Sequence, residues 1–267
     1  MSKRLDLYIA EKGLAKSRER AKELVKSGSV CVDGKIVTKP SAMVEVNSEI
    51  TVIGHAFEYV GRGALKLKHA FECFDLNIEN KICADIGAST GGFTQIMLEN
   101  GAKKVYAIDV GHDQLAQELV QDNRVINCEG VNVRNLTKDF FSQPVEFMAG
   151  DLSFISLKLT IPPLKECIAD NGEMVMLIKP QFEAGKQALN KKGIVKDKKD
   201  HVRVLTELLG FFEACGLTVK GLEPSSIKGG DGNIEYLAWL KNTSAEKSIN
   251  TKLNVKDFVE SAFLKFK

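Results

Sequence analysis

The chain has 267 residues, of which 44% are hydrophobic, and a formal net charge of +2 at pH 7. This length exceeds one small domain and falls short of three, so we expect one medium-sized catalytic domain with a small appendage. The six cysteines form no Cys-x-x-Cys pair, which disfavours a disulfide framework or a zinc cluster and favours buried thiols in a reducing compartment. Because no secretory signal and no run of about 18 apolar residues occurs, we expect a soluble, cytoplasmic protein without a membrane partner.

The first 54 residues have the pattern of a small α+β unit. Apolar residues recur at helical spacing over residues 5–9 and again over residues 21–25, where Ser17 is a candidate helix cap. The period then changes to two. Residues 30–37 predict two short strands around an Asp-Gly turn, and residues 44–46 with 50–53 predict a second pair of strands.

This N-terminal unit is basic. Residues 1–40 contain ten basic and five acidic side chains, a net charge of +5, and the cations crowd the start and the exposed side of the second helix. Such a face can neutralise phosphates, although a solvated helix face is the simpler alternative. Residues 17–34, SRERAKELVKSGSVCVDG, resemble the core of the S-four-like RNA-binding domain. The resemblance implies RNA contacts from Arg4, Lys16, Arg18, Arg20, Lys22, Lys26 and, beyond this unit, Arg62.

A larger α/β domain is expected to follow. Gly61 and Gly63 precede a helical pattern over residues 64–74, in which Lys66 lies off the centre of the apolar face. Seven strand-like runs then alternate with helical patterns, at 82–86, 104–110, 125–128, 145–150, 173–178, 217–222 and 234–240. The alternation predicts a Rossmann-like, doubly wound, mostly parallel seven-stranded sheet. We assign residues 1–58 to the basic unit with its linker, 59–244 to this domain and 245–267 to a C-terminal extension with a helix over 255–266.

Residues 84–94, ADIGASTGGFT, predict a strand, a glycine-rich turn and a helix. Such a turn lets a ligand approach the backbone closely, and the helix start offers unpaired N–H groups. The glycines do not form G-x-G-x-x-G, and no Lys-Ser/Thr pair follows, so dinucleotides and ATP are disfavoured. With Asp85 on the strand and Asp109 ending the next one, the arrangement resembles the S-adenosylmethionine site of Rossmann-like methyltransferases.

That resemblance implies specific contacts to the cofactor. Asp109 would accept both ribose hydroxyls, Asp85 would face the amino-acid end, and Asn132 would border the adenine. The implied set is Asp85, Gly87, Ala88, Ser89, Gly91, Asp109 and Asn132. For Asp109 and Asn132, an ordinary loop residue is the alternative.

The methyl acceptor is indicated by polar residues near the strand ends. The fourth strand ends in Gly150-Asp151-Leu152-Ser153-Phe154, without the proline pair of amino-methylating enzymes or the cysteine of base-carbon enzymes. Asp151, Lys179 and Glu235 lie at three strand ends, and Lys66 completes the order Lys-Asp-Lys-Glu. This order resembles the catalytic tetrad of the FtsJ-type ribose 2′-O-methyltransferases.

Several motifs together resemble the TlyA (hemolysin A) family: YVGRGALKL from Tyr59, DLSFISL from Asp151, KPQFE from Lys179 and GNIEY from Gly232. The resemblance implies S-adenosylmethionine-dependent 2′-O-methylation of cytidine in ribosomal RNA or ribosomal subunits. No carboxylate cluster outside the tetrad suggests a metal, and the oligomeric state cannot be read. A non-catalytic RNA-binding assembly factor and a membrane-active hemolysin are the alternatives. Lys179 could be the general base, which requires its pKa to fall by about three units, or an electrostatic guide.

Overall fold

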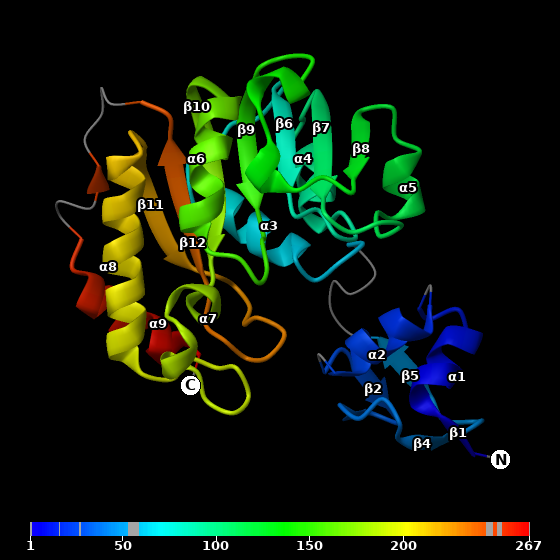
Figure 1. Cartoon of the computed structure of the whole chain (residues 1–267). Coiled ribbons are helices and arrows are strands. Elements are labelled where there is room, and N and C mark those ends of the chain that lie inside the picture. The colour runs from blue at the N-terminus through cyan, green and yellow to red at the C-terminus, as the bar shows by residue number, and fades with distance from the viewer. Residues whose placement is uncertain are drawn as a thin grey trace. The chain divides into compact units, whose positions relative to one another are not determined.

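The computed structural model describes residues 2–15, 17–26, 28–52, 59–243, 248–249 and 253–266. The chain divides into two compact units, residues 1–60 and 61–267 (Figure 1). The predicted RNA contact Lys16 and the side chain of Arg20 lie outside the described residues.

In the first unit, Leu5, Ile9 and Leu24 belong to a small core between its helices and strands. Its elements are β1 (Ser2–Arg4), α1 (Leu5–Glu11), α2 (Arg18–Lys26), β2 (Val30–Val32), β3 (Lys35–Ile36), β4 (Met43–Glu45) and β5 (Ile50–Val52). The predicted hairpin over residues 30–37 is confirmed, because β2 pairs with β3 around Asp33 and Gly34, which both have positive φ. The two strands predicted at residues 44–46 and 50–53 are present as β4 and β5, although residue 53 lies outside the described residues, but they do not pair with each other. β4 pairs with β1, a three-residue strand too short for a recognisable alternation, and β5 pairs with β2.

A buried carboxylate organises the basic side of this unit. Asp6 is fully buried and accepts hydrogen bonds from Nε (3.0 Å) and Nη2 (3.1 Å) of Arg4 and from Nε of Arg18 (3.1 Å). The hydrogen bond from Arg4 is the main reason that the pKa of Asp6 falls to about 2. Both arginine side chains remain more than two-fifths exposed. Two of the predicted RNA contacts are therefore held in place by one acid.

We expect Asp6→Asn to increase hydrogen exchange of the α1 amides about tenfold at pH 7, because two charged donors lose their acceptor. The pKa of Asp6 is lower in the folded chain than in the unfolded chain, so its stabilisation is present above pH 3.8 and is lost as pH falls toward 2. The difference between wild type and variant should therefore shrink at pH 2.5. Equal differences at both pH values would show that the carboxylate charge is not responsible.

The second unit is built on a seven-stranded sheet in the order β11-β12-β10-β9-β6-β7-β8. Its strands are β6 (Ile82–Ile86), β7 (Lys104–Asp109), β8 (Val125–Glu129), β9 (Val145–Gly150), β10 (Ile168–Ile178), β11 (Thr218–Pro224) and β12 (Tyr236–Lys241). The pairs β8–β7, β7–β6, β6–β9 and β9–β10 are parallel, and β12 is antiparallel to both β10 and β11. The prediction of a mostly parallel, doubly wound sheet is confirmed.

Helices cover both faces of this sheet (Figure 1). They are α3 (Ala64–Cys73), α4 (Gly92–Glu99), α5 (Gln117–Val120), α6 (Leu157–Cys167), α7 (Pro180–Glu183), α8 (Lys198–Ala214) and α9 (Val255–Lys265). On one face, Phe71 of α3 meets Phe147 of β9 with ring centroids 6.2 Å apart. On the other, Met148 and Met176 join α6 and α8 in the main core cluster. Neighbouring residues of one strand thus face different helices, as the pleat requires.

The antiparallel strand β12 matters for the position of polar residues. Tyr236 at its start pairs with Ile178 at the end of β10. The start of β12 therefore lies at the edge of the sheet where the parallel strands end, and Glu235 lies there just before the strand rather than inside it.

All six cysteines are free; Cys83 and Cys167 are buried as expected, whereas Cys73 is exposed. None of the described helices is both long enough and apolar enough to span a membrane.

Candidate active site

Lys66 comes from a helix and reaches the carboxyl edge of the sheet. Lys66 is only 7% exposed. Its Nζ donates to Oδ2 of Asp151 (2.9 Å) and to Oε2 of Glu235 (2.8 Å). Burial by itself would lower the pKa of Lys66, but the charges of Asp151 and Glu235 outweigh burial and raise it above its ordinary value. Lys66 is therefore a fixed cation at neutral pH, and it is poorly suited to accept a proton.

Asp151 bridges the two lysines. It follows β9, while Lys179 follows β10, and Nζ of Lys179 lies 2.6 Å from Oδ1 of Asp151. Burial would raise the pKa of Asp151, but Lys66 and Lys179 together lower it below its ordinary value. Lys179 also donates to Oγ of Ser153 (2.7 Å). Asp151 is thus a charged acceptor shared between two ammonium groups.

Glu235 closes the far end of the group. It is 2% exposed, and its Oε1 accepts a hydrogen bond from Nε2 of Gln181 (3.0 Å). Sequence reasoning did not single out Gln181; its place two residues after Lys179 in KPQFE was the available signal. Oε1 of Gln181 is buried, and it has no hydrogen-bond partner among the described residues.

The four tetrad residues predicted from chain order therefore lie together in one connected group. Asp151 and Lys179 sit just past strand ends as expected. Lys66 belongs to α3, and Glu235 precedes its strand. Two cations and two anions face one another, so the group is formally neutral although it is largely buried.

An exposed aromatic side chain borders the tetrad. Phe154 is 91% exposed and has a φ of 62°, which is unusual for a bulky residue. Its ring centroid lies 5.0 Å from that of Phe182, and Nζ of Lys179 lies 5.7 Å from the Phe182 centroid. No pattern in the sequence indicates that Phe154 lies at the surface, because an aromatic residue just after a strand usually packs inward.

Asp85 lies inside β6 and is 1% exposed. Its Oδ2 accepts hydrogen bonds from the backbone N–H (2.8 Å) and the hydroxyl (2.7 Å) of Thr94 on α4. Its Oδ1 is buried and has no hydrogen-bond partner in the described part of the chain. Burial raises the pKa of Asp85 to about 7. One carboxylate oxygen thus lacks a donor that a bound cation could supply.

The glycine-rich turn follows β6 directly. Gly87 has a φ of 85°, and a Cβ there would lie 3.1 Å from the carbonyl oxygen of Asp151. Gly91 has a φ of 94°, and a Cβ there would meet the side-chain ends of Leu119 and Leu115. Backbone conformation and packing within the domain therefore already favour glycine at both positions. The contact of Gly87 also places the turn directly beside the tetrad.

Asp109, the last residue of β7, joins the turn to the next loop. Its Oδ2 accepts from the N–H of Ser89 (2.8 Å), and its Oδ1 accepts from the N–H of Gly111 (2.7 Å). Each carboxylate oxygen has a second lone pair, so Asp109 can still accept two hydroxyls. Ala88 between the glycine and Ser89 is buried. Asn132 follows β8, and its Oδ1 accepts from the N–H of Arg134 (3.1 Å).

The remaining predicted RNA contacts lie on the surface or near it. Lys22 pairs with Glu19 (3.3 Å), and Lys26 is exposed at the end of α2. Arg62, in the second unit, donates from Nη2 to the carbonyl of Lys228 (3.3 Å). Among the described residues, no group of three or more His, Cys, Asp or Glu side chains could hold a metal ion.

Comparison with known proteins identifies the family. Residues 59–242 match the FtsJ-like methyltransferase family, and residues 3–50 match the S4 domain. The 16S/23S rRNA (cytidine-2′-O)-methyltransferase TlyA of Mycobacterium tuberculosis is 38% identical, over 93% of each chain. The chain belongs to the TlyA family of FtsJ-like methyltransferases.

Two further relatives agree with this assignment to the TlyA family. YqxC of Bacillus subtilis is 45% identical over 89% of this chain and 85% of its own. A solved structure from Streptococcus thermophilus is 41% identical, with a TM-score of 0.80, and the match covers 99% of this chain and 97% of that one. The predicted family, fold and S-adenosylmethionine cofactor are thereby confirmed.

Proposed function

We propose that this protein transfers a methyl group from S-adenosylmethionine to the 2′-hydroxyl of a cytidine ribose in ribosomal RNA. The observation that carries the proposal is the buried chain Glu235–Lys66–Asp151–Lys179, whose Asp151 touches the glycine-rich turn. We infer the target nucleotide, cytidine, and the target RNA from the TlyA relative, which is named for cytidine-2′-O methylation of 16S and 23S rRNA. Ribosomes in the cytoplasm would be its substrate.

The residues around the turn fit the cofactor. The free Oδ1 of Asp85 would accept the positively charged amino group, and Asp109 would accept the ribose hydroxyls. Gly87, Ala88, Ser89 and Gly91 would line the cofactor, and Asn132 would border the adenine. When bound, S-adenosylmethionine supplies a methyl group on a sulfonium, which is attacked in line from the opposite side.

The acceptor hydroxyl must be positioned and must give up its proton. We assign both tasks to Lys179, in two alternative forms. Its Nζ donates to Oγ of Ser153 and lies 2.6 Å from Oδ1 of Asp151. As an ammonium group it would orient the ribose oxygen with an N–H, whereas as a neutral amine it would take the proton of the hydroxyl on its lone pair. Lys66, fixed as a cation by two acids, holds Asp151 and Glu235 in place rather than acting on the hydroxyl.

The S4 domain and Phe154 would bring RNA to this site. Arg4, Lys16, Arg18, Arg20, Lys22, Lys26 and Arg62 would neutralise phosphates without reading the sequence. Phe154 offers an exposed ring that packs on Phe182, the ring that Lys179 faces, and proteins that read unpaired RNA bases commonly stack them on such rings.

The proposal is tested by mapping methylated riboses in ribosomal RNA from cells with and without this protein. We expect a 2′-O-methylated cytidine that disappears with the gene and returns when the purified protein and S-adenosylmethionine are added to the unmethylated subunits. Binding of S-adenosylmethionine and of RNA without any ribose methylation would instead favour a non-catalytic assembly factor.

We expect Phe154→Ala to reduce transfer at low RNA concentration about 10- to 100-fold, because stacking of a base on an aromatic ring contributes about 1–3 kcal/mol. Phe154→Tyr, which keeps the ring, should stay within about threefold of wild type. The dissociation constant for S-adenosylmethionine, measured by calorimetry, should not change in either variant. Equal activity of the Ala and Tyr variants would exclude a stacking role.

A further inference from the structure

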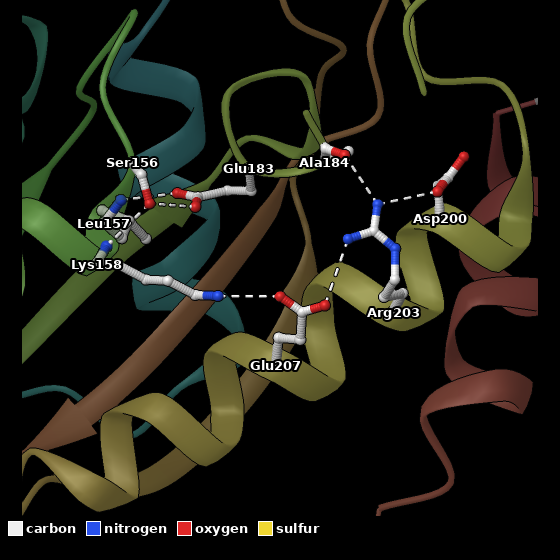
Figure 2. Close-up of polar contacts among 8 residues, drawn as sticks. All are labelled: Ser156, Leu157, Lys158, Glu183, Ala184, Asp200, Arg203 and Glu207. Atoms are coloured by element: carbon white, nitrogen blue, oxygen red, sulfur yellow. Dashed lines mark hydrogen bonds and ion pairs between the residues drawn. The ribbon is translucent and has the colours of Figure 1, made fainter. Parts of the chain in front are cut away.

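A second connection joins the two loops that carry the tetrad's Asp151 and Lys179 (Figure 2). Glu183, the last residue of α7, accepts a hydrogen bond from the Ser156 hydroxyl at Oε2 (2.6 Å) and from the Leu157 N–H at Oε1 (2.7 Å). Leu157 is the first residue of α6, and Ser156 is its N-cap. Glu183 therefore holds the start of the helix that follows the Asp151 loop.

Two sets of side-chain contacts join the same two backbone segments, one after β9 and one after β10. On one side, Lys179 contacts Asp151 and Ser153; on the other, Glu183 contacts Ser156 and the residue after it. Ser156 is three positions after Ser153, and Glu183 is four positions after Lys179. Because α7 is a single helical turn that joins the two contacts, we expect a shift of Glu183 relative to Ser156 to change the geometry at Lys179.

The side chain of Glu183 is partly buried. Burial raises the pKa of Glu183 above its ordinary value, even though the bonds from Ser156 and Leu157 act in the opposite direction. A carboxylate that accepts two donors at a helix N-terminus is well satisfied there, since the first amides of a helix lack partners within it.

Further polar contacts surround this link, but they are exposed (Figure 2). Arg203 of α8 donates to the carbonyl oxygen of Ala184 (2.8 Å), and Glu207 pairs with Lys158 (2.9 Å) and with Arg203 (3.3 Å). The paired side chains are 42–45% exposed, so water and salt weaken these ion pairs. They provide a matched control on the same side of the domain.

We propose that Glu183 is a positioning residue, which sets the distance between Lys179 and the Asp151–Ser153 loop through its bonds to Ser156 and Leu157. Glu183 itself does not contact the tetrad. Its role in catalysis rests on the proposed methyl transfer, whereas its effect on the placement of Lys179 can be measured without any reaction.

The first test is the NMR signal of the Lys179 side chain in the full-length protein without RNA, assigned with Lys179→Arg. We expect Glu183→Ala to shift this signal. Glu183→Gln should leave it nearly unchanged, because the amide oxygen can accept from Leu157 and the amide nitrogen can donate to the Ser156 oxygen. Glu207→Gln, which breaks only the exposed pairs, should also leave it unchanged. An unmoved Lys179 signal in Glu183→Ala would overturn the proposal, whatever the catalytic result.

The second test is the rate of transfer to unmethylated ribosomal subunits. We expect kcat to fall about 10- to 100-fold in Glu183→Ala, with KM for RNA and the dissociation constant of S-adenosylmethionine within twofold of wild type. The Gln variant should recover most of kcat, and Glu207→Gln should match wild type. An unchanged kcat in Glu183→Ala would overturn the proposal.

Two results separate folding and function from positioning. If Glu183→Ala no longer binds S-adenosylmethionine, Ser156→Ala replaces it, since this variant removes one of the same two bonds; a shifted Lys179 signal then supports the proposal, and an unshifted one overturns it. A shifted signal in a protein whose wild type methylates no ribosomal RNA would support the positioning of Lys179 and count only against the proposed function.

Discussion

Replacing Lys179 by alanine is expected to lower the rate of methyl transfer to ribosomal RNA by about a thousandfold or more. A positioned group that exchanges a proton with the reacting hydroxyl contributes about 10²–10⁴-fold, and loss of orientation adds to this effect. Lys66 is held between two acids, whereas Lys179 lies beside one acid and donates to the neutral hydroxyl of Ser153, so we assign the substrate hydroxyl to Lys179. Transfer is measured with labelled S-adenosylmethionine and unmethylated ribosomal subunits.

The cofactor site should survive this change. Lys179 contacts Asp151 and Ser153, whereas Asp85 binds Thr94, so the dissociation constant of S-adenosylmethionine should stay within about threefold of wild type. Lys103→Ala serves as the matched control, because this exposed lysine precedes β7 and lies at the opposite edge of the sheet. Undiminished transfer by Lys179→Ala would rule out the assigned role.

Lys179→Arg separates the two roles of the lysine. Arginine keeps a positive charge but cannot be deprotonated in proteins, so it can guide the hydroxyl and cannot act as a base. If Lys179 is the general base, the arginine variant should be as inactive as the alanine variant, and the rate of the wild type should rise with pH. Substantial activity of the arginine variant would identify an electrostatic guide.

The sequence predicted the tetrad but not its connections. Lys66 and Glu235 are 169 residues apart, and only the order Lys-Asp-Lys-Glu suggested that they meet. Parallel strands bring Asp151 and Lys179 to one edge of the sheet, but Lys66 reaches this edge from α3 and Glu235 lies at the start of the antiparallel β12. The contact of Gln181 with Glu235 depends on the orientation of the short helix α7. The contacts of Glu183 with Ser156 and Leu157 depend on how close two loops lie in space. No periodic pattern of residues in the sequence predicts either set of contacts.

Two other differences have local causes. The pairing of β1 with β4 involves strands of three residues, for which alternation gives no information. Phe154 is exposed and has a positive φ, a conformation that a bulky residue rarely adopts and that sequence patterns do not predict.

Binding of S-adenosylmethionine is expected to depend on pH through Asp85. Its pKa is about 7 in the cofactor-free protein, so below pH 7 the carboxyl is mostly protonated and no longer attracts the cofactor's ammonium group. The dissociation constant should therefore be about 25-fold higher at pH 5.5 than at pH 7.5, measured by calorimetry without RNA. Asp109→Asn should weaken binding but keep this pH dependence, whereas Asp85→Asn should remove it.

The same carboxyl has the opposite effect on folding. The pKa of Asp85 is higher in the folded chain (about 7) than its ordinary value of 3.8, so the folded state binds the extra proton between these values. The stability from this group is fully present below pH 3.8 and is lost as pH rises toward 7, at a cost of about 4 kcal/mol for a shift of roughly three units. The buried, unpartnered Oδ1 is the structural reason for this cost.

Asp85→Asn should therefore raise the unfolding temperature of the cofactor-free protein by about 10 °C at pH 8, because a neutral amide avoids burying a charge and can still accept from Thr94. At pH 4, where the carboxyl is protonated in the folded protein, the two proteins should unfold at nearly the same temperature. The variant should bind S-adenosylmethionine at least about a hundredfold more weakly, since the ammonium group loses its ion partner. A variant that is more stable and still binds the cofactor with wild-type affinity would show that the orphan oxygen of Asp85 does not face the cofactor.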